Sequence, residues 1–203
     1  MSDPADLPEP LLALIASERV SGRTRLTLLA RGAVDAAHLP TVLTEHQFAI
    51  LGAVVDRVIP QTGPALIDIA ARIERSLAAG IGDGWRFAQL PGDLEAYRAA
   101  LDSLDSLART ERSAAFVDLD AQAQDALLGR IQQQSASWAS ASLSAVQMAL
   151  WFEDLRSDAV RIYVAHPLTQ ARIGYQGFAN GGDGERRQGF QRLAAGDREG
   201  WER

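Results

Sequence analysis

The chain has 203 residues, with 26 acidic and 20 basic side chains and a formal net charge of −6 at pH 7. This balance disfavours a nucleic-acid-binding protein, because such domains present a basic face to phosphate. The chain has no cysteine, which excludes disulfides, thiolate catalysis, cysteine-ligated iron–sulfur clusters and covalent haem attachment within it.

The N-terminal stretch MSDPADLPEPLLALIASERV shows no targeting signal. Its apolar part, residues 11–16, is too short for the hydrophobic region of a signal peptide, and no basic or twin-arginine segment precedes it. No apolar run in the chain approaches the ~20 residues needed to span a bilayer. We therefore expect no direct membrane insertion and a cytoplasmic location. The periplasm is the alternative if the chain is exported with a partner or if a signal has been trimmed.

Helical periodicity recurs along the chain, whereas the two-residue alternation of strands does not persist. The first two helices are expected over residues 10–17 and about 21–31, with Leu26 and Leu29 facing inward. Thr44 and Gln47 then fit a capping box, in which each side chain binds the backbone amide of the other residue. The helix behind this box should stop at Ile59, because a residue before proline avoids α geometry.

Pro64 is expected to open the next helix, since a proline at the first helical position loses no hydrogen bond. Leu66, Ile69, Ile73 and Leu77 form its apolar stripe, and Gly80 is its expected C-terminal cap.

Three further helices are expected. One follows Pro91, one follows an Asp120 cap, and one runs from Ser142 or Ser144 to a stop before Pro167. Trp138 and Trp151 are expected in the core. The predicted fold class is all-α, a compact bundle of about six helices with a long irregular C-terminal extension. We divide the chain into an N-terminal helical extension (1–43), a helical core domain (44–166) and an irregular partner-binding tail (167–203).

A search for catalytic chemistry predicts no catalytic, cofactor-binding or metal-binding residue. The three histidines, His38, His46 and His166, are not spaced as the paired ligands of a helical zinc site, and no Glu-x-x-His motif occurs. The chain also lacks the Gly-x-Ser-x-Gly nucleophile elbow and the phosphate-binding P-loop.

The C-terminal stretch HPLTQARIGYQGFANGGDGERRQGF combines glycines with aromatic residues and arginines. It is not a dinucleotide fingerprint, because Arg187 stands where the third glycine should be. It is not a calcium loop either, because Gln191 occupies the position of the closing glutamate. His166 is expected to cap the backbone carbonyls at the end of the preceding helix.

Two glycine-containing segments remain as candidates for contact with another protein, since Trp, Tyr, Phe and Arg are enriched in interface cores. The candidate interface residues are Trp85, Arg86, Phe87, His166, Pro167, Tyr175, Phe178, Phe190 and Trp201. The alternative is that these aromatic side chains pack against the chain's own helices.

Several segments, taken in order, resemble the gluconate 2-dehydrogenase subunit 3 family. They are Phe48–Leu51, Asp56–Gln61, Ile67–Ile73, Gly82–Arg86 with Leu90-Pro91, Ala96-Tyr97 with Leu101 and Leu104-Asp105, Phe116–Leu119 with Gln124, and His166-Pro167 with Ile173–Phe178. The resemblance covers roughly residues 44–178, with a further echo at Gly200–Glu202.

The resemblance implies a non-catalytic small subunit bound to a large FAD-containing flavoprotein of the glucose-methanol-choline type. The complex that the resemblance implies is an oxidoreductase acting on CH–OH groups of sugars, sugar acids or glycosides, including glucosides oxidised at C3. FAD and the catalytic residues belong to the partner, and some complexes add a cytochrome c subunit. The small subunit supports folding, stability and, in many members, twin-arginine export, whose signal this sequence lacks.

Two other functions are kept open. The chain could be a stand-alone helical adaptor that binds a non-redox partner. It could also be an enzyme in its own right that uses His46 or His166 with nearby carboxylates.

Overall fold

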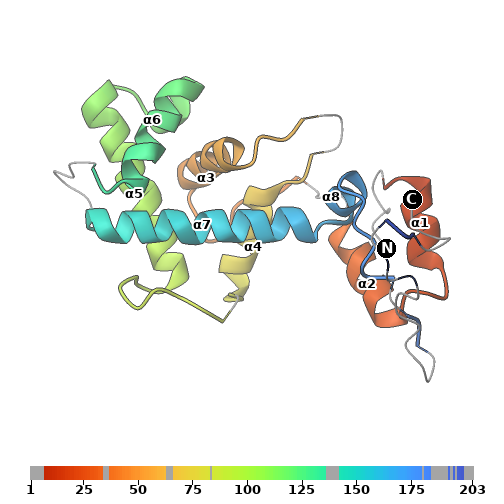
Figure 1. The fold of residues 1–203 in the computed structure, drawn as a ribbon. Coiled ribbons are helices and arrows are strands. Elements are labelled where there is room, and N and C mark those ends of the chain that lie inside the picture. The colour runs from red at the N-terminus through yellow and green to blue at the C-terminus, as the bar shows by residue number, and fades with distance from the viewer. Residues whose placement is uncertain are drawn as a thin grey trace. The chain divides into compact units, whose positions relative to one another are not determined.

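The computed structural model describes residues 7–33, 37–62, 66–82, 84–135, 142–179, 181–183, 192, 194 and 196–198. These residues form eight α-helices and one short 3-10 helix (Figure 1), and an isolated strand-like bridge pairs Val20 with Gly181. The predicted all-α class is confirmed. The chain divides into two compact units, which we call the terminal unit (residues 1–36 and 163–203) and the central unit (residues 37–162).

The terminal unit is built from both ends of the chain. It contains α1 (Glu9–Ala16), α2 (Gly22–Arg31) and α8 (Pro167–Arg172). Its core is made by Leu7, Leu11, Leu14, Ile15, Val20, Leu28 and Ala179. Because Ala179 is buried with the side chains of α1 and α2, the N-terminal helices and the segment after α8 share one core.

The central unit is organised around α3 (Glu45–Val58), which packs against α4 (Ile69–Ala79), α5 (Asp93–Arg112), α6 (Ala121–Gln132) and the 3-10 helix η1 (Phe116–Asp118). The side chains of Ile50, Leu51 and Val54 on α3 are fully buried.

The long helix α7 (Ala145–Ala165) adds Trp151 to this core. The Trp151 ring meets the Tyr97 ring of α5 edge-on at 5.9 Å, which confirms that Trp151 is a core residue. Trp138 lies outside the described residues.

The predicted helix ends are confirmed where they depend on local hydrogen bonds. Thr44 and Gln47 form the capping box of α3, and the Asp120 side chain caps α6 by accepting from the Ala123 amide. Gly80 ends α4 in the left-handed conformation, with φ of +64°. These helix ends were predictable from the sequence because each depends on hydrogen bonds between residues at most four positions apart.

Two predictions about α2 and α4 are wrong. Leu26, expected to face inward, is 72% exposed, because α2 packs on its neighbours through Leu28 instead. The helix expected to open at Pro64 begins at Ile69, behind an Asp68 cap, and Leu66 is 63% exposed. The Gln61 side chain explains the late start, because its amide binds both the N–H and the C=O of Ile67 and so holds Ile67 outside the helix.

The expected C-terminal extension begins with a short helix and then contacts the N-terminal part of the chain. Residues 167–172 form α8, and the Gly-Gly-Asp run that follows pairs with the turn before α2. The Gly181 amide donates to the Arg19 carbonyl at 2.9 Å, and the Asp183 carboxylate accepts from the Gly22 amide at 2.7 Å. A Cβ at Gly182 would lie 2.2 Å from the Glu18 carbonyl oxygen. This close approach accounts for the glycine.

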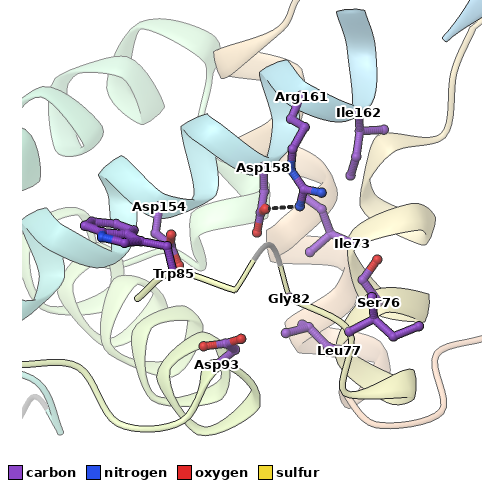
Figure 2. A pocket seen from close by; sticks show the side chains of 11 residues that line it. Ile73, Ser76, Leu77, Gly82, Trp85, Asp93, Asp154, Asp158, Arg161 and Ile162 are labelled. Carbon is purple, nitrogen blue, oxygen red and sulfur yellow. Dashed lines mark hydrogen bonds and ion pairs between the residues drawn. The ribbon is translucent and has the colours of Figure 1, made fainter. Parts of the chain in front are cut away.

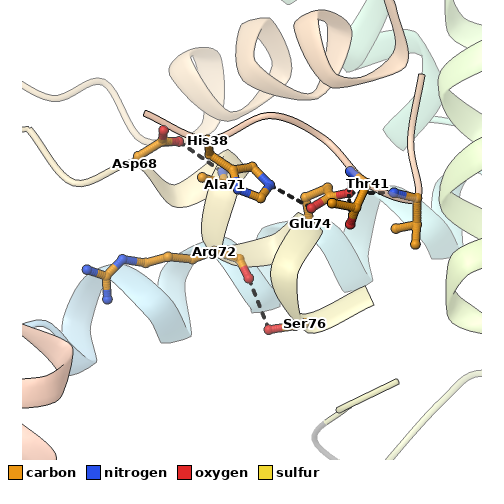
Figure 3. Close-up of polar contacts among 8 residues, drawn as sticks. His38, Thr41, Asp68, Ala71, Arg72, Glu74 and Ser76 are labelled. Atoms are coloured by element: carbon orange, nitrogen blue, oxygen red, sulfur yellow. Dashed lines mark hydrogen bonds and ion pairs between the residues drawn. The ribbon is translucent and has the colours of Figure 1, made fainter. Parts of the chain in front are cut away.

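A buried carboxylate fastens the start of the central unit. Glu74 of α4 is fully buried and accepts hydrogen bonds from the backbone amides of Thr41 (2.6 Å) and Val42 (2.8 Å) and interacts with His38 Nε2 at 2.6 Å (Figure 3). Burial opposes its ionisation, but the two amides and His38 outweigh that effect and lower the pKa of Glu74 from 4.5 to about 2. Glu74 therefore holds residues 38–42 against α4 as an ionised group.

We expect Glu74→Gln to lower the free energy of unfolding by about 2–4 kcal/mol at pH 7, because hydrogen bonds to a buried charge are lost. The folded-state pKa is depressed, so the carboxylate stabilises the fold fully above the unfolded value of 4.5 and loses this effect as the pH falls toward 2. The difference between wild type and variant should therefore shrink from pH 7 to pH 3 in urea unfolding followed by circular dichroism.

The matched control is Glu153→Gln, since Glu153 is exposed on α7. It should change stability by less than about 0.5 kcal/mol. Equal losses in the two variants, or a Glu74→Gln effect that is independent of pH, would contradict the proposed role of Glu74.

Candidate partner-binding surfaces

The loop between α4 and α5 displays an aromatic pair on the central unit. Gly84 has φ of +86°, a left-handed conformation that suits glycine and lets the chain turn sharply. Trp85, which follows it, is 61% exposed, and its ring meets that of Phe87 edge-on at 4.5 Å. Arg86 between them is also exposed. The loop therefore presents two of the predicted interface residues to solvent, with Phe87 half-buried behind Trp85.

Trp85 lines one side of a shallow depression, which we call the Trp85 hollow (Figure 2). Side chains from α4, the loop, α5 and α7 surround it. They are those of Ile73, Ser76, Leu77, Ile81, Trp85, Asp93, Asp154, Asp158, Arg161 and Ile162. Its enclosed volume of about 20 Å³ has room for about one water molecule. Ligand pockets usually measure about 300–1,000 Å³, so the hollow is no site for a sugar or a flavin.

The Trp85 hollow has an acidic wall. Asp93, Asp154 and Asp158 line it together with one arginine, Arg161, whose guanidinium lies 2.6 Å from Asp158. The Tyr97 hydroxyl also donates to Asp158, at 3.0 Å. Burial raises the pKa of Tyr97 well above its usual value, and the negative charges of Asp158, Asp154 and Asp93 raise it further. A net negative wall beside an exposed indole suits a cationic group, which can stack on the ring.

A second feature of the central unit joins His46 to a carboxylate. Asp105 of α5 interacts with His46 Nε2 at 2.9 Å and accepts from Arg109 Nε at 2.8 Å and from the Phe116 amide at 2.8 Å. Burial would raise the pKa of Asp105, but these three groups together lower it below its usual value. The half-exposed His46 lines an open hollow of about 420 Å³.

The His46–Asp105 pair has the composition of an acid–base couple, which the enzyme alternative requires. Its hydrogen bonds also have a structural explanation. Asp105 holds the first residue of η1 through the Phe116 amide, and the Gln124 side chain binds the Phe116 carbonyl at 3.0 Å. The carboxylate therefore ties α5 to η1 and α6 whether or not His46 transfers protons.

His166 and Pro167 lie inside the terminal unit. Both are buried, and His166 Nδ1 accepts from the Leu168 amide at 3.2 Å as the N-cap of α8. The expectation that His166 caps carbonyls at the end of the preceding helix is therefore wrong. The reason is that Pro167 starts a new helix, so the nearest unpaired groups are amides rather than carbonyls.

Tyr175 and Phe178 follow α8 and behave differently from each other. Tyr175 is 50% exposed and its ring lies over Gly177, where a Cβ would come within 2.7 Å of the tyrosine hydroxyl. Phe178, whose ring centre lies 6.4 Å from that of Tyr175, packs against the terminal unit's own core. Tyr175 thus remains available to a partner, while the alternative of packing on the chain's own helices holds for Phe178. Phe190 and Trp201 lie outside the described residues.

The sequence-based search missed the acidic wall of the Trp85 hollow. Asp154 and Asp158 lie four residues apart on α7, a spacing that places both on one helix face. The four-residue spacing was visible in the sequence. Whether Asp154 and Asp158 lie near Asp93 and Trp85, however, depends on the packing of α7 against α5, which no local pattern predicts.

No cluster of three or more His, Asp or Glu side chains suited to hold a metal ion occurs in the part of the chain that the structure describes. None of the described helices combines the length and apolarity needed to cross a membrane.

A family model described as gluconate 2-dehydrogenase subunit 3 matches residues 45–182, which is more than half of the chain. The match includes the aromatic loop, the acidic wall and the segment from α8 to Gly182. No curated protein matches the chain, and no solved structure does.

We expect Asp105→Asn to lower the free energy of unfolding by about 1.5–3 kcal/mol at pH 7, because it removes the charge that three donors bind. Amide hydrogen exchange at Phe116 should accelerate, since that amide loses its charged acceptor. The lowered pKa of Asp105 means that its contribution is present above its unfolded pKa and is lost as the pH falls through the folded value.

The control is Asp118→Asn, an exposed residue of η1. It should leave both stability and Phe116 exchange almost unchanged. If the amide exchange rate of Phe116 is unchanged in Asp105→Asn, the proposal that Asp105 holds η1 in place is contradicted.

Proposed function

The chain belongs to the gluconate 2-dehydrogenase subunit 3 family, and we propose that it is the non-catalytic small subunit of an FAD-dependent dehydrogenase of the glucose-methanol-choline type. In this proposal FAD and the substrate site belong to the large subunit, which oxidises a sugar, a sugar acid or a glycoside, with C3 of a glycoside as one candidate position. The small subunit stabilises and scaffolds this partner. A cytochrome c subunit is a further candidate member of the complex.

The exposed Trp85 is the observation that carries the proposed partner-binding role. A large indole usually buries most of its surface, and Trp is among the residues most enriched at energetically important interface positions. Trp85 instead lies 61% exposed beside Phe87 and an acidic wall. We propose that a lysine or arginine of the flavoprotein stacks on Trp85 and pairs with this wall.

The proposed partner contacts are Trp85, Arg86 and Phe87 on the central unit and, separately, Tyr175 on the terminal unit. His166, Pro167 and Phe178 are assigned a supporting role, because they position the backbone that carries Tyr175. Phe190 and Trp201 remain proposed contacts.

Co-expression tests the proposal. The tagged chain is isolated from its native host, the flavoprotein that copurifies is identified, and this flavoprotein is then produced with and without the chain. We expect the soluble yield and thermal midpoint of the flavoprotein to fall when the chain is omitted, and the isolated chain to show no flavin absorbance and no turnover. Full soluble activity of the flavoprotein alone would overturn the scaffold function. Turnover by the isolated chain would support the enzyme alternative, with the His46–Asp105 pair as the candidate acid–base couple.

We expect Trp85→Ala to weaken association with the flavoprotein by about tenfold or more, in line with the loss of about 1.4–3 kcal/mol at an interface tryptophan. The free energy of unfolding of the chain itself should change by less than about 1 kcal/mol, because most of the side chain is already in water. Isothermal titration calorimetry and urea unfolding measure the two effects.

Leu39→Ala is the matched control, since Leu39 is a large exposed apolar residue of the same unit but outside the loop. It should leave association unchanged. Equal affinities of the two variants would exclude Trp85 from the interface.

A further inference from the structure

We propose that residues 168–177, which we call the α8 strap, form a movable strap on the terminal unit. The strap detaches from α1 and α2 by local unfolding, while these two helices and the segment around Ala179 stay folded. This movement is a property of the isolated chain, so it does not depend on the proposed flavoprotein.

Three buried side-chain oxygens of the α8 strap lack a hydrogen-bond partner among the described residues. They are Thr169 Oγ1, Gln170 Oε1 and Gln176 Oε1. Each of them costs free energy in the folded state, because the atom has given up its hydrogen bonds to water without replacing them. Local unfolding returns all three oxygens to water. This cost is therefore removed when the strap detaches, which favours the detached state.

The α8 strap also packs incompletely against α1. A groove of about 280 Å³ is lined by Pro8 and Leu11 of the α1 region together with Gln170 and Tyr175 of the strap. The strap therefore lacks part of the van der Waals contact that a close-packed interior would supply. Ile173 is already 62% exposed and Tyr175 is half-exposed, so detachment gives up little further apolar burial at these two side chains.

The helix within the strap cannot persist once it has left the core. The Ile173 amide donates to the Thr169 carbonyl at 3.0 Å, and the Tyr175 amide donates to the Gln170 carbonyl at 2.8 Å. These hydrogen bonds belong to a helix of six residues, which is too short to be stable by itself. It depends on apolar contacts with the core, such as that of Leu168. Detachment therefore opens these backbone hydrogen bonds as well.

The rest of the terminal unit is tied together independently of the strap. Arg25 of α2 donates to the carbonyls of Ile15 and Ser17, both at 2.9 Å, and to that of Val20 at 3.3 Å. These hydrogen bonds join the end of α1 to α2. Beyond the strap, Ala179 is buried in the core that α1 and α2 share. The strap can therefore detach while α1 and α2 remain packed on each other.

The strap carries Tyr175, which the proposed function makes a partner contact. Tyr175 lies between Gly174 and Gly177, and Gly174 has φ of +68°, a conformation that favours glycine. A partner that bound Tyr175 would have to hold the strap in one arrangement. Partner binding would then be coupled to closure of the strap.

Native-state amide hydrogen exchange of the isolated full chain tests this movement. We expect the amides of Ile173 and Tyr175 to exchange at least about 30-fold faster than that of Leu28 in α2, relative to their intrinsic rates, because local opening requires less free energy than unfolding of the whole unit. The difference should shrink as urea is added, since urea promotes the opening that exposes more surface.

Thr169→Val tests the cause of the movement, because valine has the shape of threonine without the hydroxyl. We expect this variant to slow exchange at Ile173 and Tyr175 about fivefold, since the closed strap no longer contains that unpaired oxygen. Gln170→Met removes a second unpaired oxygen and should slow exchange at the same two amides.

Thr24→Val is the matched control, because it makes the same substitution on α2 of the same unit. The Thr24 hydroxyl is paired, since it accepts from Ser21 Oγ at 2.8 Å. Loss of this hydroxyl should therefore not slow exchange in the strap.

Two outcomes would overturn the proposal. One is equal protection of the Tyr175 and Leu28 amides in the wild-type chain. The other is that neither Thr169→Val nor Gln170→Met slows exchange in the strap, which would mean that these oxygens are already satisfied in solution. Neither measurement involves the flavoprotein, so the proposed function and the movable strap can fail separately.

Discussion

The central unit depends on one buried negative charge. Glu74 lies on α4, yet its hydrogen bonds reach back more than thirty residues to Thr41, Val42 and His38. Residues 38–42 lead directly into the capping box of α3, and α3 is the helix on which α4, α5 and α6 pack. Two successive backbone amides bind the carboxylate, so the direction in which the chain enters α3 is fixed by electrostatics as well as by apolar packing.

The helices were largely predictable because most of their signals are local. The Thr44–Gln47 box, the Asp120 cap and the left-handed Gly80 each involve residues within one helical turn. The two wrong predictions concern features that are determined by residues or helices outside the local pattern. Gln61 delays the start of α4 by binding Ile67, and the choice of Leu28 over Leu26 as the buried face of α2 depends on which helices pack against it. Helix α8 was missed because its six residues are too few to show periodicity.

The candidate surfaces were predictable in part. Trp85 and Tyr175 were recognised from residue type and neighbouring glycines, and both are exposed. The same reasoning could not separate them from Phe178, which packs on the chain's own core, because burial is a property of the fold. Sequence reasoning could not find the acidic wall either, because packing brings its side chains together. Nor could it find the unpaired Gln170 side-chain oxygen, because the lack of a hydrogen-bond partner is also a result of packing. The partner contacts themselves remain predictions.

The shared core of the terminal unit has a consequence for the order of folding. Helices α1 and α2 are synthesised before the central unit, but their core is closed by Ala179 and by the pairing of Gly181 with the turn before α2. The central unit is synthesised in between and can fold as a domain while translation continues. Helices α1 and α2 can therefore complete their core only after the segment that contains Ala179 and Gly181 has been synthesised. A partner that recognised the terminal unit would then engage only chains in which the whole central unit had been synthesised, so assembly itself would select against products truncated within that unit.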